Sequence, residues 1–342
     1  MLGRLESRAA IGYIFATLDP GSHARRPMRH SPEIFKESAK RMEQFFQQLT
    51  NGLAVGSIYA LIALGYTMVY GVLKLINFAH SELFTLGAYL GLTLLTSMSI
   101  TNHLGPLGGI LVLAVMVMGL VALVGAFLDR VAYRPLRQSP RLSAVVSALG
   151  ASIFLQNTIM LVYGARFQVY PQDILPKSAL NIYGVEVPLV RLMVLGTSLL
   201  MMGFLYFFIQ KTRVGTAIRA AAIDQGAAKL MGINVDRVIL LVFMIGPAMG
   251  GAAGLMVGLY YGQINFMMGW GYGLKAFTAA ILGGIGNIPG AMLGGLLLGI
   301  IEALGASYIS FAWKDAIAFL VLILILIVRP TGILGERVAE KV

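Results

Sequence analysis

The sequence predicts an all-α, polytopic membrane protein, and three observations support this prediction. Of the 342 residues, 58% are hydrophobic and only 12% are charged, which gives a mean hydropathy of +0.80. A water-soluble domain needs far more polar surface than this. The apolar residues fall into runs of roughly 20 residues, the length that crosses a bilayer as a helix. Glycine is frequent, at 41 residues, as in helices that pack closely in lipid.

The N-terminal 41 residues differ from everything that follows. They are rich in arginine and lysine, contain three prolines and lack a long apolar run, so they form neither a signal peptide nor a span. Two interpretations stay open: a disordered basic tail held near anionic lipid on the cytoplasmic side, or a protein whose natural start is Met42. We therefore divide the chain into this tail (1–41), a transmembrane domain (42–335) and a short C-terminal tail (336–342).

Eight apolar runs in the transmembrane domain are interpreted as spans. They cover approximately 49–73, 81–98, 107–128, 143–163, 189–209, 238–261, 290–309 and 315–328. A further apolar stretch, 274–285, is only about half a span long. We expect about eight transmembrane helices plus short broken or re-entrant helices. The topology of the first and last spans depends on whether 274–285 crosses the membrane.

Basic residues concentrate in two loops, 129–142 and 211–237. Two predicted spans separate these loops, so both lie on one side of the membrane, and the positive-inside rule identifies that side as the cytoplasm. The segment 164–188 then lies on the opposite side, where its prolines favour a small hairpin.

The second basic loop predicts a short cytoplasmic helix from Ala217 to about Met231. Gly232 is suited to end this helix in a left-handed conformation, and Asp236 or Asn234 can cap the next one. A helix that rests on the lipid surface should carry bulky apolar residues on one face and lysines on the other. This helix is rich in alanine instead, which favours docking into a groove of another protein. The candidate docking residues are Arg219, Asp224, Ala228, Leu230, Met231 and Gly232.

Two series of glycines recur at intervals of four residues, a spacing that keeps them on one stripe of a helix. Such a stripe lets another backbone approach closely, so we interpret both as helix-packing seams, with sliding during gating as the alternative. Pro247, within the first series, should kink its helix. The candidate packing residues are Gly246, Gly250, Gly254, Gly258, Gly286, Gly290 and Gly294.

Ionisable residues near the apolar spans are few: Lys74, His80, Glu82, Lys275 and Glu302. Such groups are costly in lipid and usually face protein or a water-filled cavity. The densest polar cluster, from Asn77 to Glu82, should break the helix between the first two spans.

A faint internal repeat aligns 81–91 with 274–284 and places Glu82 and Lys275 at equivalent positions. These two residues then either pair across the halves or reach the membrane interface from helix ends. The candidate pathway residues are Asn77, His80, Glu82 and Lys275.

Several chemistries are excluded or disfavoured by the sequence. There is no cysteine, which excludes disulfides and thiolate sites, and the four histidines lack the spacing of metal ligands. No ATP-binding loop and no catalytic constellation is present. The net charge of +11 lies in the tail and the loops, so it indicates orientation in the membrane and not nucleic-acid binding.

From Met42 onward the chain closely resembles the LivH-type permease subunit of bacterial ABC importers for branched-chain amino acids. The stretches that carry the resemblance are 51–71 (NGLAVGSIYALIALGYTMVYG), 76–80 (INFAH), 130–137 (RVAYRPLR), 275–286 (KAFTAAILGGIG) and 329–335 (RPTGILG). The tail 1–41 departs from the pattern.

The resemblance implies a multi-pass subunit of the bacterial inner membrane that forms half of a translocation pathway. Its partners would be a second permease subunit of the LivM type, two cytoplasmic ATPases that bind the ATP, and a periplasmic binding protein that mainly sets substrate choice. This chain itself would need no cofactor and would not be an enzyme. The helix in 211–237 then looks like the coupling helix that docks on the ATPase.

Two alternatives remain open for the function. The cargo of an ABC permease could be another amino acid, or urea or a related amide. From another class, an ion-coupled secondary transporter would need membrane-embedded acids and would work without ATPases. An intramembrane enzyme is disfavoured because the sequence shows no catalytic constellation.

Overall fold

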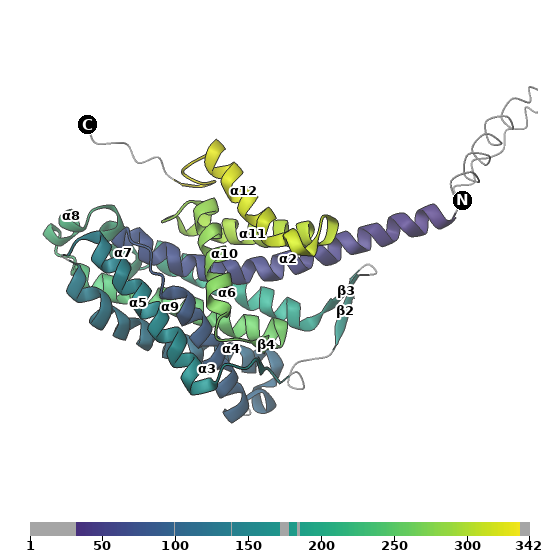
Figure 1. Ribbon diagram of the computed structural model, residues 1–342, viewed down its shortest axis with the longest axis horizontal. Helices are drawn as coiled ribbons and strands as arrows, with labels where there is room; N and C mark the ends of the chain where they lie inside the picture. The colour runs from purple at the N-terminus through teal and green to yellow at the C-terminus, as the bar shows by residue number, and fades with distance from the viewer. Residues whose placement is uncertain (1–31, 99, 138, 172–177, 183–184, 336–342) are drawn as a thin grey trace, which may run out of the picture. The chain divides into compact units, whose positions relative to one another are not determined.

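The computed structural model describes residues 32–335 apart from 99, 138, 172–177 and 183–184 (Figure 1). The predictions for 1–31 and 336–342 fall outside these residues. The described helices are α2 Pro32–Leu73, α3 His80–Met98, α4 Ile100–Leu128, α5 Arg141–Tyr163, α6 Leu189–Lys211, α7 Arg213–Ile223, α8 Gln225–Leu230, α9 Val235–Tyr261, α10 Met268–Gly283, α11 Ile288–Tyr308 and α12 Lys314–Val328. Short π and 3-10 turns follow α4 at Asp129–Tyr133 and Arg134–Leu136, and another precedes α12 at Phe311–Trp313.

The first helix, α2, begins at Pro32, inside the segment that the sequence assigned to a disordered tail. Proline suits the first turn of a helix, because its missing N–H has no partner there in any case. Glu37 and Arg41, one turn apart, form an ion pair at 2.7 Å on the exposed surface. Residues 32–41 are therefore helical, and the basic composition that indicated disorder belongs here to a solvated helix.

Seven of the described helices are long and apolar enough to cross a membrane: α2, α4, α5, α6, α9, α11 and α12. The expected span 81–98 is a helix, α3, but it is not among the seven. The half-span 274–285 belongs to α10, which has 16 residues and is therefore about 24 Å long, shorter than the hydrocarbon core. The all-α membrane fold is confirmed. Seven described helices have the length and composition of a span, so the expected count of about eight is not confirmed, and α3 and α10 fall outside the seven.

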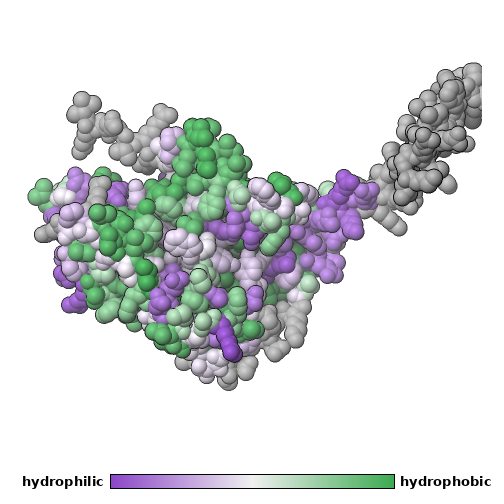
Figure 2. Space-filling model, in the orientation of Figure 1, coloured by the Kyte–Doolittle hydropathy of each residue, from purple (hydrophilic) through white to green (hydrophobic). Residues whose placement is uncertain are grey.

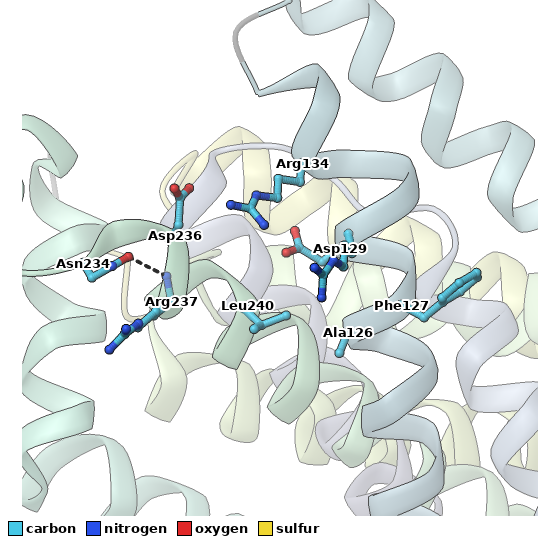
Figure 3. A pocket seen from close by; sticks show the side chains of 9 residues that line it. Ala126, Phe127, Asp129, Arg134, Asn234, Asp236, Arg237 and Leu240 are labelled. Atoms are coloured by element: carbon cyan, nitrogen blue, oxygen red, sulfur yellow. Dashed lines mark hydrogen bonds between the residues drawn. The ribbon is translucent and has the colours of Figure 1, made fainter.

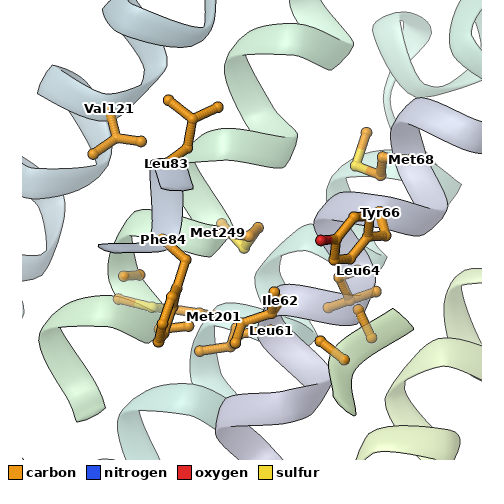
Figure 4. Close-up of a cluster of buried hydrophobic side chains, with 14 of the residues drawn as sticks. Leu61, Ile62, Leu64, Tyr66, Met68, Leu83, Phe84, Val121, Met201 and Met249 are labelled. Atoms are coloured by element: carbon orange, nitrogen blue, oxygen red, sulfur yellow. The ribbon is translucent and has the colours of Figure 1, made fainter. Parts of the chain in front are cut away.

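The core of the membrane domain surrounds α2 and α9. The apolar windows of these helices are 94% and 78% buried within the chain, against only 6% for α12. Figure 4 shows part of this core, where Ile62 of α2, Phe84 of α3 and Met249 of α9 are among the buried side chains. By contrast, α12 presents hydrophobic side chains on the surface at the top of Figure 2.

Glycines of α9 let neighbouring backbones approach it closely. A Cβ added at Gly254 would clash with the carbonyl oxygen of Phe84, so α3 touches α9 backbone to backbone. Gly250 lies against the ring of His80 and Gly258 against the ring of Tyr170. The predicted stripe is thus occupied by other parts of the same chain.

Only part of the second glycine series lies in a helix. Gly290 and Gly294 of α11 face α10, where added Cβ atoms would clash with the carbonyl oxygens of Gly283 and Ala279. Gly286 instead precedes α11, with a φ of +96°, and its nearest neighbour across the gap is Gly71. Its assignment to the helical seam is therefore wrong, because a positive φ ends a helix and places Gly286 in the turn.

Two short antiparallel strand pairs lie outside the helices. β2 (Ala179–Ile182) pairs with β3 (Val185–Pro188), which is the hairpin expected in 164–188. β1 (Gln168–Val169) pairs with β4 (Gln263–Ile264), so the loop after α9 lies on the same side as that hairpin segment. Figure 1 shows α8 and the β2–β3 hairpin at opposite ends of the helices.

Contacts at the other end define the second face of the membrane domain. Gln225, at the start of α8, donates a hydrogen bond to the carbonyl oxygen of Val72 at 2.7 Å. Gly71 and the α10–α11 turn at Gly286 are neighbours. This face also carries the basic loops, so it is the cytoplasmic face by the positive-inside rule. Because α10 runs from the loop holding β4 to this face, α10 with its flanking loops crosses the membrane.

Candidate functional site

The predicted cytoplasmic helix is two helices, α7 and α8, that meet at Asp224. The Oδ1 atom of Asp224 accepts hydrogen bonds from the backbone N–H groups of Gly226 (2.8 Å) and Ala227 (3.0 Å) and so caps α8. Asp224 itself has an extended backbone, with φ −151° and ψ 110°. The expectation of one continuous helix over 217–231 is therefore wrong, because an aspartate that caps from its side chain competes with helical continuation.

The end of α8 is fixed by a Schellman motif. Gly232 has a φ of +83°, and its N–H donates to the carbonyl of Lys229 at 3.0 Å. The N–H of Ile233 donates to the carbonyl of Ala228, also at 3.0 Å. Asn234 then caps α9 by accepting from the N–H of Arg237 at 3.1 Å. The predicted left-handed end of the helix at Gly232 is confirmed. Of the two residues predicted to cap the next helix, Asn234 and Asp236, the cap is Asn234.

The tip formed by α7 and α8 exposes three large apolar side chains. Ile223 is 88% exposed, Leu230 is 90% exposed and Met231 is 82% exposed. Large apolar side chains gathered on an exposed surface are typical of a site that a partner covers. Leu230 and Met231 are two of the predicted docking residues.

Two other predicted docking residues face the protein instead of the solvent. Ala228 is only 4% exposed. Arg219 donates from Nη1 to the carbonyls of Ile209 (2.8 Å) and Gln210 (3.0 Å) and to the side chain of Gln210 (2.7 Å), so it holds α7 against the end of α6. Both residues support the tip and do not form its outer surface.

A further link on this face was missed by sequence reasoning. The guanidinium of Arg137 hydrogen-bonds both carboxylate oxygens of the buried Asp129, at 2.6 and 2.8 Å, and also pairs with Asp236. It thereby ties the turns after α4 to the first turn of α9. The pairing of Arg137 with Asp129 could have been suspected from their short spacing in the sequence. The pairing of Arg137 with Asp236 of α9 could not, because these residues are 99 positions apart.

The polar cluster between α2 and α3 forms a buried break in the helix, as expected. Residues 74–79 are not helical, and Asn77 is only 2% exposed. The Asn77 Oδ1 atom accepts from the Tyr133 hydroxyl and from the N–H of Ala79 (3.1 Å). Irregular backbone at membrane depth needs such internal partners. Asn77 therefore links the π turn after α4 to the break.

The side chain of the next polar residue, His80, packs between α2 and α9. Its ring lies against Gly65 of α2 and Gly250 of α9, with its Nε2 atom 3.2 Å from the carbonyl oxygen of Ile62. The ring of Tyr66 meets it edge-on at 4.6 Å between centroids. These contacts enclose His80 on all sides that the structure describes, and it is fully buried.

Glu82 is a buried carboxylate with an unsatisfied oxygen. Its side chain is 2% exposed, and within the described part of the chain its Oε2 atom has no hydrogen-bond partner. Its Oε2 points toward Gly269, in the first turn of α10, where an added Cβ would lie 2.9 Å away. The beginnings of α3 and α10 therefore meet at this carboxylate inside the membrane domain.

Lys275 does not pair with Glu82, so that prediction is wrong. Its Nζ atom lies 2.7 Å from Glu302 of α11 and 2.7 Å from Asp315 of α12, and Glu302 also accepts from the hydroxyl of Tyr59 at 2.9 Å. The repeat placed Glu82 and Lys275 at equivalent positions, but Glu82 is the third residue of α3 and Lys275 the eighth residue of α10. It could not show that Lys275 points away from α3 toward α11, because helical direction depends on packing.

A cavity of about 270 Å³ adjoins this ionic group. It opens beside residues 48–55 of α2 and the end of α9, on the face opposite the basic loops. Its lining includes Gln48, Asn51, Tyr260, Tyr261, Glu302 and Lys314. An ammonium and a carboxylate beside each other can present complementary charges to a zwitterion. No group of three metal-ligating side chains occurs among the described residues.

Comparison with known proteins identifies the relatives of the chain. The family described as the permease component of branched-chain amino acid transport systems matches residues 48–326. The permease protein LivH of the high-affinity branched-chain amino acid transport system of Escherichia coli K12 is 45% identical over 306 residues, covering 87% of this chain and 98% of that protein.

Two further relatives extend the range of organisms. The corresponding permease protein BraD of Pseudomonas aeruginosa is 46% identical over 320 residues, covering 91% of this chain and all of that protein. A probable branched-chain amino acid permease of Methanocaldococcus jannaschii is 26% identical over 303 residues, 84% of this chain and 91% of the relative. No solved structure matches the chain.

Proposed function

The chain belongs to the family of permease components of branched-chain amino acid transport systems, and we propose that it forms half of the membrane pathway of an ABC importer for leucine, isoleucine and valine. The match over 48–326 carries this proposal, because it covers the spans, the buried break and the α7–α8 tip together. Partner ATPases supply the energy, and a binding protein outside the membrane delivers the amino acid. The protein is a multi-pass protein of the bacterial inner membrane.

We further propose that the α7–α8 tip is the surface on which an ATPase subunit docks. The exposed side chains of Leu230 and Met231 supply the apolar contact, since side chains that are 82–90% exposed lose the most water-accessible surface on docking. The caps at both ends of α8 hold these side chains in a fixed position. A partner therefore meets a preorganised surface and has little loop entropy to remove on binding.

The same tip can pass motion into the membrane domain. The Schellman motif and the Asn234 cap join α8 to α9 through a tight turn. α9 in turn packs against α3 along Gly250 and Gly254, next to the buried break at 74–79. A displacement of the tip by the ATPase thus acts on one of the two most buried helices of the core.

The docking proposal is tested by placing a charge on the tip. We expect Leu230→Asp to lower both uptake and ATPase stimulation at least tenfold, because a carboxylate must be desolvated in an apolar contact. The level of the complex in the membrane should not change, since Leu230 contributes nothing to the core. Gly232→Ala tests the geometry separately, because alanine at a φ of +83° is strained and should misplace the tip.

The matched control is Phe167→Asp, which introduces the same carboxylate at an apolar residue that is 64% exposed in the loop on the opposite face. It should leave ATPase stimulation at the wild-type level. Unimpaired uptake and ATPase stimulation in Leu230→Asp would refute docking at this surface.

For the pathway, we propose that Glu82 and Lys275 lie along the route of the amino acid, while Asn77 and His80 hold the break that shapes it. The support is the unsatisfied buried oxygen of Glu82 and the cavity beside the partners of Lys275. Competition of labelled leucine uptake by isoleucine, valine and urea identifies the cargo. Uptake that persists without the ATPases and collapses with the ion gradient would favour the secondary transporter instead.

A further inference from the structure

A cavity of about 490 Å³ lies on the cytoplasmic face between the end of α4 and the start of α9 (Figure 3). Its lining is unusual in combining charged and apolar side chains. Arg134 reaches from the turn after α4 toward α9, while Ala126 and Leu240 lie between the two helices. The lining residues are Ala126, Phe127, Asp129, Arg130, Arg134, Asn234, Asp236, Arg237 and Leu240.

The charge of this cavity is positive, because three arginines line it against two aspartates, Asp129 and Asp236, and a fourth arginine, Arg137, pairs with both aspartates. Arg130 and Arg134, in contrast, form no ion pair within the described part of the chain, and Arg237 at the rim forms none there either. Three guanidinium groups are therefore free to bind an anion with several oxygens, such as a phosphate.

An apolar track leads along the membrane-facing side of α4 to these arginines. Leu123 and Phe127 are 63% and 61% exposed, and their spacing of four residues places them on one side of the helix. Val131, four residues after Phe127, continues this side and is 59% exposed. The track meets Arg130 and Arg134 at the end of the span, which is the depth of the lipid headgroups.

We propose that this cavity binds the phosphate headgroup of an anionic phospholipid of the cytoplasmic leaflet, with its acyl chain along the α4 track. Arg130 and Arg134 hold the phosphate, and Arg237 closes the site from the start of α9. Basic cavities between transmembrane helices on the cytoplasmic side suit such headgroups. The track beside the charges favours a lipid over a free phosphate or an acidic segment of the ATPase, neither of which needs an exposed apolar path.

The site lies where it can affect coupling. Asp236 and Arg237 belong to the first turn of α9, directly after the turn that ends α8. A lipid that links Arg134 to Arg237 would fasten the start of α9 to the end of α4, alongside the existing bridge through Arg137. Anionic lipid should therefore stiffen the connection through which the tip moves α9.

The test measures lipid bound to the intact importer complex by native mass spectrometry. The purified complex is depleted of lipid and then given dioleoylphosphatidylglycerol or dioleoylphosphatidylcholine. We expect the wild type to retain the phosphatidylglycerol. Each arginine near the surface contributes about fivefold in affinity, so Arg130→Gln with Arg134→Gln should weaken retention roughly 25-fold. The pair Arg130→Lys with Arg134→Lys keeps the charge and should fall between the two, because lysine lacks the planar fork.

The matched control is Arg213→Gln, which removes the same charge from an exposed residue of the same face outside the cavity. It should retain phosphatidylglycerol as the wild type does. Equal loss in this control would overturn the site in favour of general surface charge, and equal retention of phosphatidylcholine would overturn headgroup recognition.

Two further measurements distinguish a bound lipid from a free anion or a protein partner in the same cavity. Displacement of the lipid by equimolar inorganic phosphate would show that a free anion occupies the cavity. Binding only after the ATPases are stripped away would show that a partner covers it. Either result refutes the lipid. Because Arg130 and Arg134 make no described ion pair, the glutamine variants should fold and assemble, which the masses of the intact complexes report directly.

Discussion

At the scale of single residues, the ionic group around Lys275 shows how charge is kept within the membrane domain. The side chains of Lys275 and Glu302 are only 13% and 9% exposed, yet each has more than one partner. The sequence correctly singled out both residues as ionisable groups near apolar spans. It could not pair them, because the partners come from α10, α11 and α12 and meet only through packing. The sequence also identified Glu82 as an ionisable residue near the apolar spans. It could not predict that one carboxylate oxygen of Glu82 lacks a hydrogen-bond partner within the described part of the chain, because this also depends on packing.

We predict that Lys275→Met destabilises the protein by about 3 kcal/mol, because it leaves the nearly buried Glu302 without its main partner. The double variant Lys275→Met with Glu302→Leu should recover most of this loss, since no buried charge is then left alone. Thermal unfolding of the purified complex measures both. A double variant no more stable than the single one would contradict the argument.

Uptake by the same double variant separates structure from transport. If Lys275 and Glu302 only stabilise the fold, the recovered protein should transport normally. If Lys275 lies along the route of the amino acid, as we propose, uptake should stay at least tenfold below the wild type even though stability is restored.

At the scale of helices, small residues determine which elements touch. The spacing of glycines predicted the seams of α9 and α11, because a stripe of period four is visible in the sequence. Sequence reasoning failed where a local cap or turn overrides that period. Gly286 continues the spacing but lies in a turn, and Asp224 interrupts an alanine-rich run that otherwise favours one helix. Both failures come from single residues with strong local hydrogen-bonding or backbone preferences.

We predict that Gly254→Ala destabilises the protein by about 1–3 kcal/mol, the usual cost of overpacking. The added methyl would clash with the Phe84 carbonyl, so α3 and α9 must separate. Gly119→Ala in α4 is the matched control, because no described atom lies within 4 Å of its Cβ position. This control should be neutral or stabilising by up to about 1 kcal/mol, since alanine is the better helix former. Equal unfolding midpoints for the two variants would argue against close backbone packing of α3 on α9 at Gly254.

At the scale of the whole molecule, the arrangement of the chain in the membrane follows from loop charge and from contacts between distant turns. The two basic loops gave the cytoplasmic face from the sequence alone. The passage of α10 could not be decided in that way, because it is too short and its flanking loops are uncharged. The structure decides it through the pairing of β4 with β1 at one end and the contact of Gly286 with Gly71 at the other. α11 therefore starts at the cytoplasmic face and α12 returns to it.

This topology predicts which positions react with a membrane-impermeant maleimide added outside the cell. The chain contains no cysteine, so single cysteines can be introduced without a prior substitution. Met267→Cys, before α10, and Ile309→Cys, after α11, are 60% and 71% exposed and should be labelled from outside. Ile223→Cys at the end of α7 is 88% exposed but should react only in permeabilised cells. If α10 did not cross, Met267 and Ile309 would lie on opposite faces, because α10 and α11 would then contribute a single crossing between them. Labelling of one but not the other would therefore refute the crossing of α10.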